Sequence, residues 1–144
     1  MFKPSGTPPH QTELAGHAPE AELRCGPFHA SSFAGCDLLV VSPGVPLATA
    51  QIVAFAQAGG QVIGDVELFA QALAGQRSRV IAITGSNGKT TVTSLVGHLC
   101  QQAGLNTVVA GNIGLPVLDA LCDIEDSGIW PDVCVLELSS FQLE

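Results

Sequence analysis

The sequence predicts an α/β protein built on buried parallel strands, and three observations carry that prediction. Short apolar runs rich in β-branched residues alternate with stretches of helical periodicity, which is the order of a doubly wound sheet. Hydrophobic residues make up 47% of the chain and charged residues only 12%, as expected where strands are covered on both faces. A glycine-rich loop follows one apolar run and leads directly into a helical stretch.

The first half of the chain contains two predicted strand–helix units after a proline-rich segment. Proline and glycine recur through residues 1 to about 20, which predicts a loop. Gly59-Gly60 would end the first helix, and Asp65 is placed to cap the second. The expected elements are, in order, a strand at 37–42, a helix at 50–58, a strand at 61–64 and a helix after Asp65 that runs through Leu68, Phe69 and Leu73.

A new unit begins after the short polar segment 75–79, and we place a domain boundary between residues 76 and 77. The acidic segment 123–128 is predicted as a turn before the last strand. The expected elements are strands at 80–84, 107–110 and 133–136 and a helix at 89–103. Apolar residues at helical spacing predict the buried face of that helix, namely Val92, Leu95, Val96 and Leu99.

Charge and composition exclude several classes of partner. The formal net charge is −8 and only five lysines and arginines are present, so no basic stripe can form for nucleic acid or an anionic membrane. No apolar run approaches the ~18 residues of a membrane span, and the start lacks the apolar stretch of a signal peptide. Five scattered cysteines without a C-x-x-C pair are interpreted as buried thiols. We therefore expect a cytoplasmic protein that acts on small molecules.

The segment Gly85-Ser-Asn-Gly-Lys-Thr-Thr91 has the chemistry of a phosphate-binding loop. Glycines allow positive φ, successive N–H groups form a concave nest, and a helix N-terminus adds partial positive charge. Lys89 would contact the β- and γ-phosphates of ATP, and the hydroxyl of Thr90 would bind Mg²⁺. The loop is shorter than the general pattern, whose first glycine position falls on Ile83, and the alternative is a plain glycine turn. The candidate nucleotide-binding residues are Gly85, Ser86, Asn87, Gly88, Lys89, Thr90 and Thr91.

Three further segments lie where strands are predicted to end. Glu137 closes an apolar strand, where an ionised carboxylate is costly unless it is paired or bound to metal, so it is a candidate magnesium ligand. Asn112 follows another strand, and ligands of open α/β sheets bind at such ends. Ser42-Pro-Gly44 is a third strand-end segment. Plain turns and a solvent-facing acid are the alternatives at these positions.

The sequence resembles the Mur ligases, and among them the members that add D-glutamate. The resemblance runs from about residue 36 to residue 144. It implies that residues 1–76 are part of a Rossmann-like domain for the UDP-substrate and that 77–144 open a central ATP-binding domain. The matching segments are Ser42-Pro-Gly44, Gly64-Asp-Val-Glu-Leu-Phe69, Gly85-Ser-Asn-Gly-Lys-Thr-Thr91, Gly111-Asn-Ile-Gly114 and Leu136-Glu-Leu-Ser-Ser-Phe-Gln-Leu-Glu144.

The chemistry that the resemblance implies is ATP-driven amide formation in peptidoglycan precursor synthesis. UDP-N-acetylmuramoyl-L-alanine would become an acyl phosphate, and the amine of D-glutamate would displace phosphate. Catalysis would be mostly positioning and electrostatics. The implied roles are catalysis by Lys89 and Glu137, Mg²⁺ binding by Thr90 and Glu137, and substrate contacts by Ser42, Gly44, Asn112, Ser139 and Gln142.

The resemblance also implies further magnesium ligands and a third domain that these residues do not include. We therefore expect the segment alone to be inactive and the complete enzyme to be a monomer. Two alternatives stay open. One is a stand-alone nucleotide-binding module, and the other is a different ligase of the same superfamily, such as folylpolyglutamate synthetase.

Overall fold

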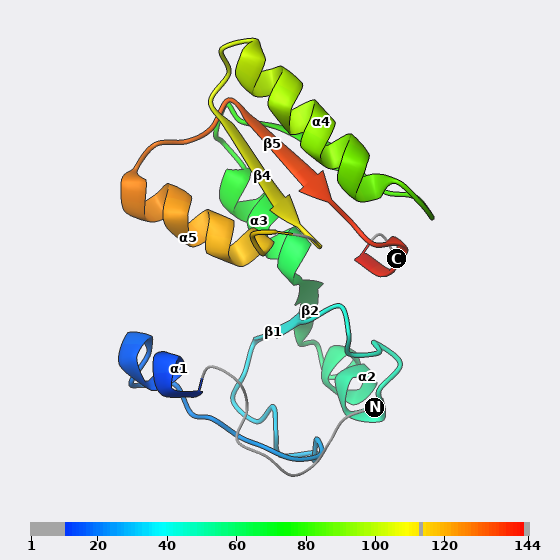
Figure 1. The fold of residues 1–144 in the computed structure, drawn as a ribbon. Coiled ribbons are helices and arrows are strands. Elements are labelled where there is room, and N and C mark those ends of the chain that lie inside the picture. The colour runs from blue at the N-terminus through cyan, green and yellow to red at the C-terminus, as the bar shows by residue number, and fades with distance from the viewer. Residues whose placement is uncertain (1–10, 113, 143–144) are drawn as a thin grey trace.

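The fold is α/β with two separate parallel sheets, as the sequence predicts (Figure 1). The computed structural model describes residues 11–112 and 114–142. Residues 1–10, Ile113 and the last two residues of the Leu136–Glu144 segment lie outside the described residues. The elements are α1 (Gln11–His17), β1 (Leu38–Val41), α2 (Ala50–Gln57), β2 (Gln61–Gly64), α3 (Asp65–Leu73), β3 (Arg79–Ile83), α4 (Lys89–Gln102), β4 (Thr107–Gly111), α5 (Val117–Ser127), β5 (Val133–Glu137) and the 3-10 helix η1 (Ser140–Gln142).

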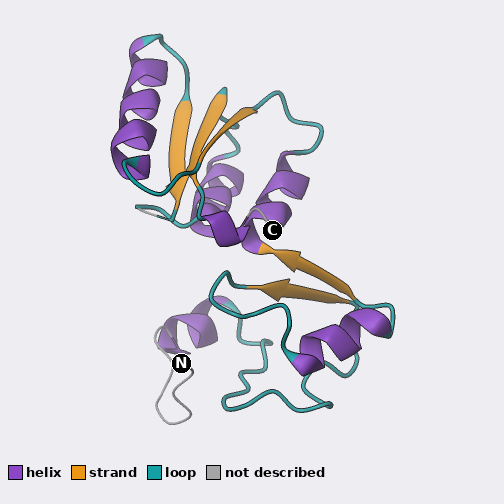
Figure 2. Ribbon diagram, turned by 90° about the vertical axis from the view of Figure 1, so that its right-hand side faces the viewer, coloured by secondary structure: helices purple, strands orange, loops and turns teal. Residues whose placement is uncertain are grey.

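The larger sheet has three strands in the order β3-β5-β4, all parallel. Helix α4 covers one face and helices α3 and α5 cover the other, so the unit is doubly wound (Figure 2). In the register of the ladders, Ile83 and Gly111 both pair with Glu137. The carboxyl ends of all three strands therefore lie at one level of the sheet.

Strand β5 forms the centre of the core, and every residue in it is buried. Side chains alternate between the two faces of a strand. Cys134 and Leu136 join the core cluster with α5, so Val133, Val135 and Glu137 face the opposite layer, which is α4. The buried cluster on the α5 side comprises Phe69, Leu73, Ala110, Val117, Ala120, Leu121, Ile124, Cys134, Leu136 and Leu138.

Asp132 ties the amino ends of the three strands together. Its carbonyl accepts a hydrogen bond from the backbone N–H of Arg79 at 3.0 Å, and its carboxylate accepts one from the N–H of Asn106 at 2.9 Å. Arg79 begins β3 and Asn106 immediately precedes β4. This residue therefore fixes the register of both outer strands against β5.

Helix α3 links the two sheets because it follows β2 directly and packs against α5. Phe69 on α3 is fully buried and belongs to the core cluster of the three-stranded sheet. The domain boundary that the sequence predicts after residue 76 stays a prediction. Helix α3 lies before this boundary in the chain, but it packs into the core of the three-stranded sheet, which lies after the boundary.

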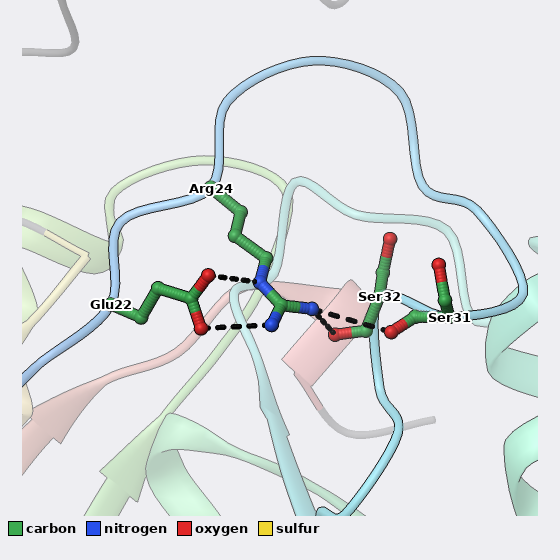
Figure 3. Close-up of polar contacts among 4 residues, drawn as sticks. All are labelled: Glu22, Arg24, Ser31 and Ser32. Carbon is green, nitrogen blue, oxygen red and sulfur yellow. Dashed lines mark hydrogen bonds and ion pairs between the residues drawn. The ribbon is translucent and has the colours of Figure 1, made fainter.

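The smaller sheet pairs β1 with β2 in parallel, from Leu38 opposite Gln61 to Val41 opposite Gly64. A loop before it is held by Arg24, whose guanidinium forms a bidentate ion pair with Glu22 at 2.8 and 2.9 Å (Figure 3). The same group donates to the carbonyls of Ser31 and Ser32 at 3.3 and 3.5 Å. These bonds fold residues 22–36 into a closed loop beside α2.

Three local predictions were wrong. Residues 123–127 belong to α5 and not to a turn, because Val117, Ala120, Leu121 and Ile124 bury one helical face while the acidic residues face outward. Asp65 is the first residue of α3 and not its cap, since Gly64 occupies the cap position. A helix, α1, lies within the segment that was predicted as loop.

The buried face of α4 also differs from the prediction. Val92, Leu95 and Leu99 are exposed, whereas Thr93 and Gly97 are buried against the sheet. A Cβ atom at Gly97 would overlap the side chain of Val109 on β4, so the helix uses a small residue to approach the sheet closely.

None of the helices within the described residues has both the length and the apolar character that crossing a membrane requires.

The cysteines were expected to be buried, but only Cys134 is, and Cys25, Cys36 and Cys122 are exposed. Burial raises the pKa of the Cys134 thiol to about 11. Because the thiolate is the reactive species, Cys134 should resist thiol reagents near neutral pH, while the three exposed cysteines react. Labelling followed by peptide mass spectrometry checks this. Equal labelling of Cys134 and Cys122 in the native protein would contradict the burial of β5.

Candidate nucleotide-binding site

The phosphate-loop candidate joins β3 to α4 at the carboxyl edge of the three-stranded sheet. Gly85 has φ +150° and Gly88 has φ +75°, conformations that L-residues with side chains rarely adopt. Gly88 is the N-cap residue of α4 and no side chain caps that helix. The N–H groups of the first turn are therefore left for another acceptor, as an anion site at a helix N-terminus requires.

Lys89 is the first residue of α4, and its side chain folds back over the loop. Its ammonium donates a 2.7 Å hydrogen bond to the carbonyl of Gly85. Ser86, Asn87, Thr90 and Thr91 are exposed around it. The positive charge of Lys89 is thus held at the loop itself by the Gly85 carbonyl.

Glu137 ends the central strand beside this loop and is only 3% exposed. The backbone on either side is held firmly: the N–H of Leu138 donates to the carbonyl of Ile83, and that of Asn112 donates to the carbonyl of Glu137, both at 2.9 Å. In the part of the chain that the structure describes, no side-chain hydrogen bond or ion pair reaches the Glu137 carboxylate. With no protein partner among these residues, the Glu137 carboxylate is available to a cation, and carboxylate oxygens are ligands that Mg²⁺ accepts.

Gly111 lies opposite Glu137 and is a residue that sequence reasoning missed. Its φ is +127°, and a Cβ atom there would overlap the backbone carbonyl of Glu137. In the sequence, Gly111 is the first glycine of the Gly111–Gly114 segment, of which only Asn112 was a candidate site residue. The close approach of its backbone to that of Glu137 follows from the register of β4 against β5, which the sequence does not give.

The substrate-binding candidates fall into two groups. Asn112 is exposed and adjoins Glu137, at the carboxyl end of β4. Ser139 and Gln142 bond each other, because the N–H and hydroxyl of Ser139 donate to the Gln142 side-chain carbonyl at 2.8 and 3.0 Å. This fixes the direction of the Gln142 amide.

A hollow at the carboxyl ends of β1 and β2 is lined by both Ser42 and Gln142. Ser42 follows β1 of the smaller sheet, whereas Gln142 lies in η1, after the central strand of the larger sheet. Gly64 and Asp65 also line it, and Asp65 was not identified as a site residue from the sequence. Gly44 does not line this hollow, although its neighbours Pro43 and Val45 do. The hollow therefore joins the strand ends of the smaller sheet to the segment after Glu137.

A magnesium ion would find few protein ligands here. Across residues 11–112 and 114–142, no three His, Cys, Asp or Glu side chains gather as a metal-binding group. Mg²⁺ is commonly held by one or two carboxylates together with substrate phosphates and waters. The Glu137 carboxylate and the Thr90 hydroxyl carry oxygen donors of the type that Mg²⁺ accepts.

Comparison with known proteins identifies the family of the chain. The family model described as "Mur ligase MurD-like, N-terminal domain" matches residues 4–64, and "Mur ligase middle domain" matches residues 83–144. The chain belongs to the Mur ligase family. The sequence-predicted domain boundary at 76/77 lies between the two matched ranges, as does the whole of α3.

Three relatives illustrate the similarity and share one name. This chain is 65% identical over 132 residues to the UDP-N-acetylmuramoylalanine–D-glutamate ligase of Chromobacterium violaceum, covering 92% of this chain and 29% of the relative. The enzyme of the same name from Thiobacillus denitrificans is 53% identical over 150 residues, covering 95% and 32%. That from Nitrosomonas europaea is 48% identical over 141 residues, covering 96% and 30%. The chain thus spans about a third of the length of these relatives.

Gly111→Ala should damage the candidate site through the backbone. Because alanine is strained at this positive φ, the substitution should lower the free energy of unfolding by about 1–3 kcal/mol. The added methyl group should also push β4 away from Glu137. We expect lower stability in urea unfolding and weaker ATP binding in calorimetry. Gly128→Ala is the matched control, because Gly128 also has positive φ, +65°, but nothing lies within 4 Å of its added Cβ. Unchanged ATP affinity in Gly111→Ala would contradict the proximity of β4 and Glu137 to the nucleotide.

Proposed function

We propose that this chain is the nucleotide-binding portion of a cytoplasmic, ATP-dependent ligase that adds D-glutamate to UDP-N-acetylmuramoyl-L-alanine. The observation that carries the proposal is the juxtaposition of a lysine-bearing glycine loop with a buried, unpaired carboxylate at the next strand end. The identity to relatives named for that reaction supports the choice of substrates.

The loop would bind the phosphates of ATP. Backbone N–H groups at the start of α4 would donate to phosphate oxygens, and Lys89 would exchange its bond to the Gly85 carbonyl for one to the β- and γ-phosphates. The nucleotide-binding residues proposed are those of the loop, Gly85 to Thr91. A bound Mg²⁺ ion would neutralise phosphate charge, with Thr90 and Glu137 as its protein ligands.

The reaction would proceed in two steps. An oxygen of the substrate's L-alanine carboxylate would attack the γ-phosphorus, and the bond to the leaving ADP oxygen would break, which gives an acyl phosphate. The amine of D-glutamate would then attack the acyl carbon, phosphate would leave, and the nitrogen would lose a proton to form the amide. Lys89 would stabilise the charge on the transferring phosphoryl group, and this kind of contact matters most in the transition state.

The remaining candidates would position the substrate. Asn112, adjoining Glu137, would contact the diphosphate of the UDP-substrate. Ser139 and Gln142 would lie near the reacting carboxylate, and their mutual hydrogen bonds would keep the Gln142 amide oriented. Ser42 and Gly44 would contact the UDP-sugar, and the hollow shared by Ser42 and Gln142 supports a substrate that spans both sheets.

The test is ATP-dependent phosphate release by a full-length enzyme that carries this segment. We expect release to require both UDP-N-acetylmuramoyl-L-alanine and D-glutamate, and other amino acids to replace D-glutamate poorly. Release with folate and L-glutamate instead would indicate a folylpolyglutamate synthetase-like ligase. ATP binding without release under any condition would indicate a nucleotide-binding module.

Lys89→Ala should lower turnover in this assay by at least ~100-fold, the scale on which transition-state charge contacts act. The matched control is Arg77→Ala, which removes an exposed positive charge from the segment before β3. Turnover close to that of the unmodified enzyme in Lys89→Ala would refute the role of the loop lysine.

A further inference from the structure

Thr93 carries a buried hydroxyl that the proposed function leaves without a role. It is 4% exposed, and together with Glu137 it makes up the buried polar and charged side chains of the described chain. Among the described residues, its hydroxyl oxygen has no hydrogen-bond partner. Buried polar groups are nearly always satisfied, so an isolated one calls for an explanation.

The packing of α4 places Thr93 at the level of Glu137. Gly97 lies against Val109 of β4, because an added Cβ there would overlap the Val109 side chain. Helix α4 starts at the carboxyl edge of the sheet and returns toward its amino edge, so it runs antiparallel to the strands (Figure 1). One turn back from Gly97, about 6 Å along the helix, is Thr93. Two residues forward from Val109, about 6.6 Å along the strand, is Gly111, whose ladder partner is Glu137.

The alternation of β5 brings the two side chains into the same layer. Cys134, Leu136 and Leu138 lie in the α5-side cluster, so the Glu137 side chain projects toward α4. Thr93 is buried on the face of α4 that packs on β4 and β5. Gly111 contributes no side chain between them. The unpartnered hydroxyl of Thr93 and the side chain of Glu137 therefore face the same layer between α4 and the sheet.

We infer that Thr93 is a positioning residue for Glu137. Its hydroxyl donates a hydrogen bond to one oxygen of the carboxylate when Mg²⁺ and nucleotide are bound, which leaves the other oxygen directed at the ion. Groups that orient a metal-ligating carboxylate in this way tune the affinity of the site for its metal. The inference rests on the proposed function, since it assigns Thr93 a role at the proposed Mg²⁺·ATP site.

Three variants of a full-length enzyme that carries this segment separate the possible roles of Thr93. Thr93→Val has nearly the same shape but lacks the hydroxyl, and Thr93→Ser keeps it. Ser94→Ala removes an exposed hydroxyl from the same helix and is the control. The measurement is the Mg²⁺ concentration that gives half-maximal binding of a fluorescent ATP analogue, together with the thermal midpoint of the metal-free protein.

Thr93→Val should raise the half-maximal Mg²⁺ concentration by about 10-fold or more, as loss of outer-shell partners of a metal commonly does. Thr93→Ser and Ser94→Ala should remain close to the unmodified enzyme. The thermal midpoint of metal-free Thr93→Val should be equal or higher, because valine removes an unsatisfied buried hydroxyl.

An unchanged Mg²⁺ requirement in Thr93→Val would overturn the inference and leave the proposed function intact. If Thr93→Val has a lower thermal midpoint but an unchanged Mg²⁺ requirement, the inference is likewise overturned, and the Thr93 hydroxyl has a structural role instead. If the unmodified enzyme binds the ATP analogue with no dependence on Mg²⁺, the proposed function itself fails. The two failures are therefore distinguishable in one experiment.

Discussion

Every part of the candidate site depends on the parallel pairing of β5 with both of its neighbours. Asp132 fixes the register at the amino ends, and the bonds from Leu138 and Asn112 fix it at the carboxyl ends. Because the three strands end at one level, the glycine loop, Glu137 and Asn112 meet at the same edge of the sheet. A slip of one residue would turn Glu137 toward the apolar layer under α5.

Glycine makes this convergence possible in two different ways. Gly85 and Gly88 supply backbone conformations for the turn, so the loop can present its N–H groups to an anion. Gly97 and Gly111 supply space instead, because one lets α4 approach β4 and the other lets β4 approach the backbone of Glu137. The layer between α4 and the sheet, which Thr93 and Glu137 face, therefore contains no side chain from either glycine.

Local patterns predicted the elements that carry the site, and tertiary packing decided the rest. Apolar runs bounded by glycine and proline gave the strand at Gln61–Gly64 with the correct ends, and the loop chemistry located the start of α4 at Lys89. The prediction of the buried face of α4 was wrong because the helix packs against the sheet through the small residues Thr93 and Gly97 and not through its larger apolar residues. The carboxyl-terminal part of α5 was not predicted as helix because its exposed face is acidic and resembles a polar turn in the sequence.

The close approach at Gly111 and the burial of Thr93 could not be foreseen, since each depends on which residue of another element lies opposite. The same is true of α3: its sequence predicts an amphipathic helix, but not that Phe69 would join the core of the three-stranded sheet. The hollow shared by Ser42 and Gln142 likewise exists only because η1 lies beside the ends of β1 and β2 (Figure 2).

We propose that Glu137 and the glycine loop form one Mg²⁺·ATP site. The most direct measurement is the affinity of a full-length enzyme for ATP by calorimetry, with and without Mg²⁺, for the unmodified protein and for Glu137→Gln. That variant keeps the shape of the side chain and removes its charge. We expect Mg²⁺ to strengthen ATP binding by the unmodified enzyme, and Glu137→Gln to lose most of this gain in affinity while its affinity for ATP without metal is retained. An equal gain from Mg²⁺ in both proteins would show that Glu137 does not bind the ion.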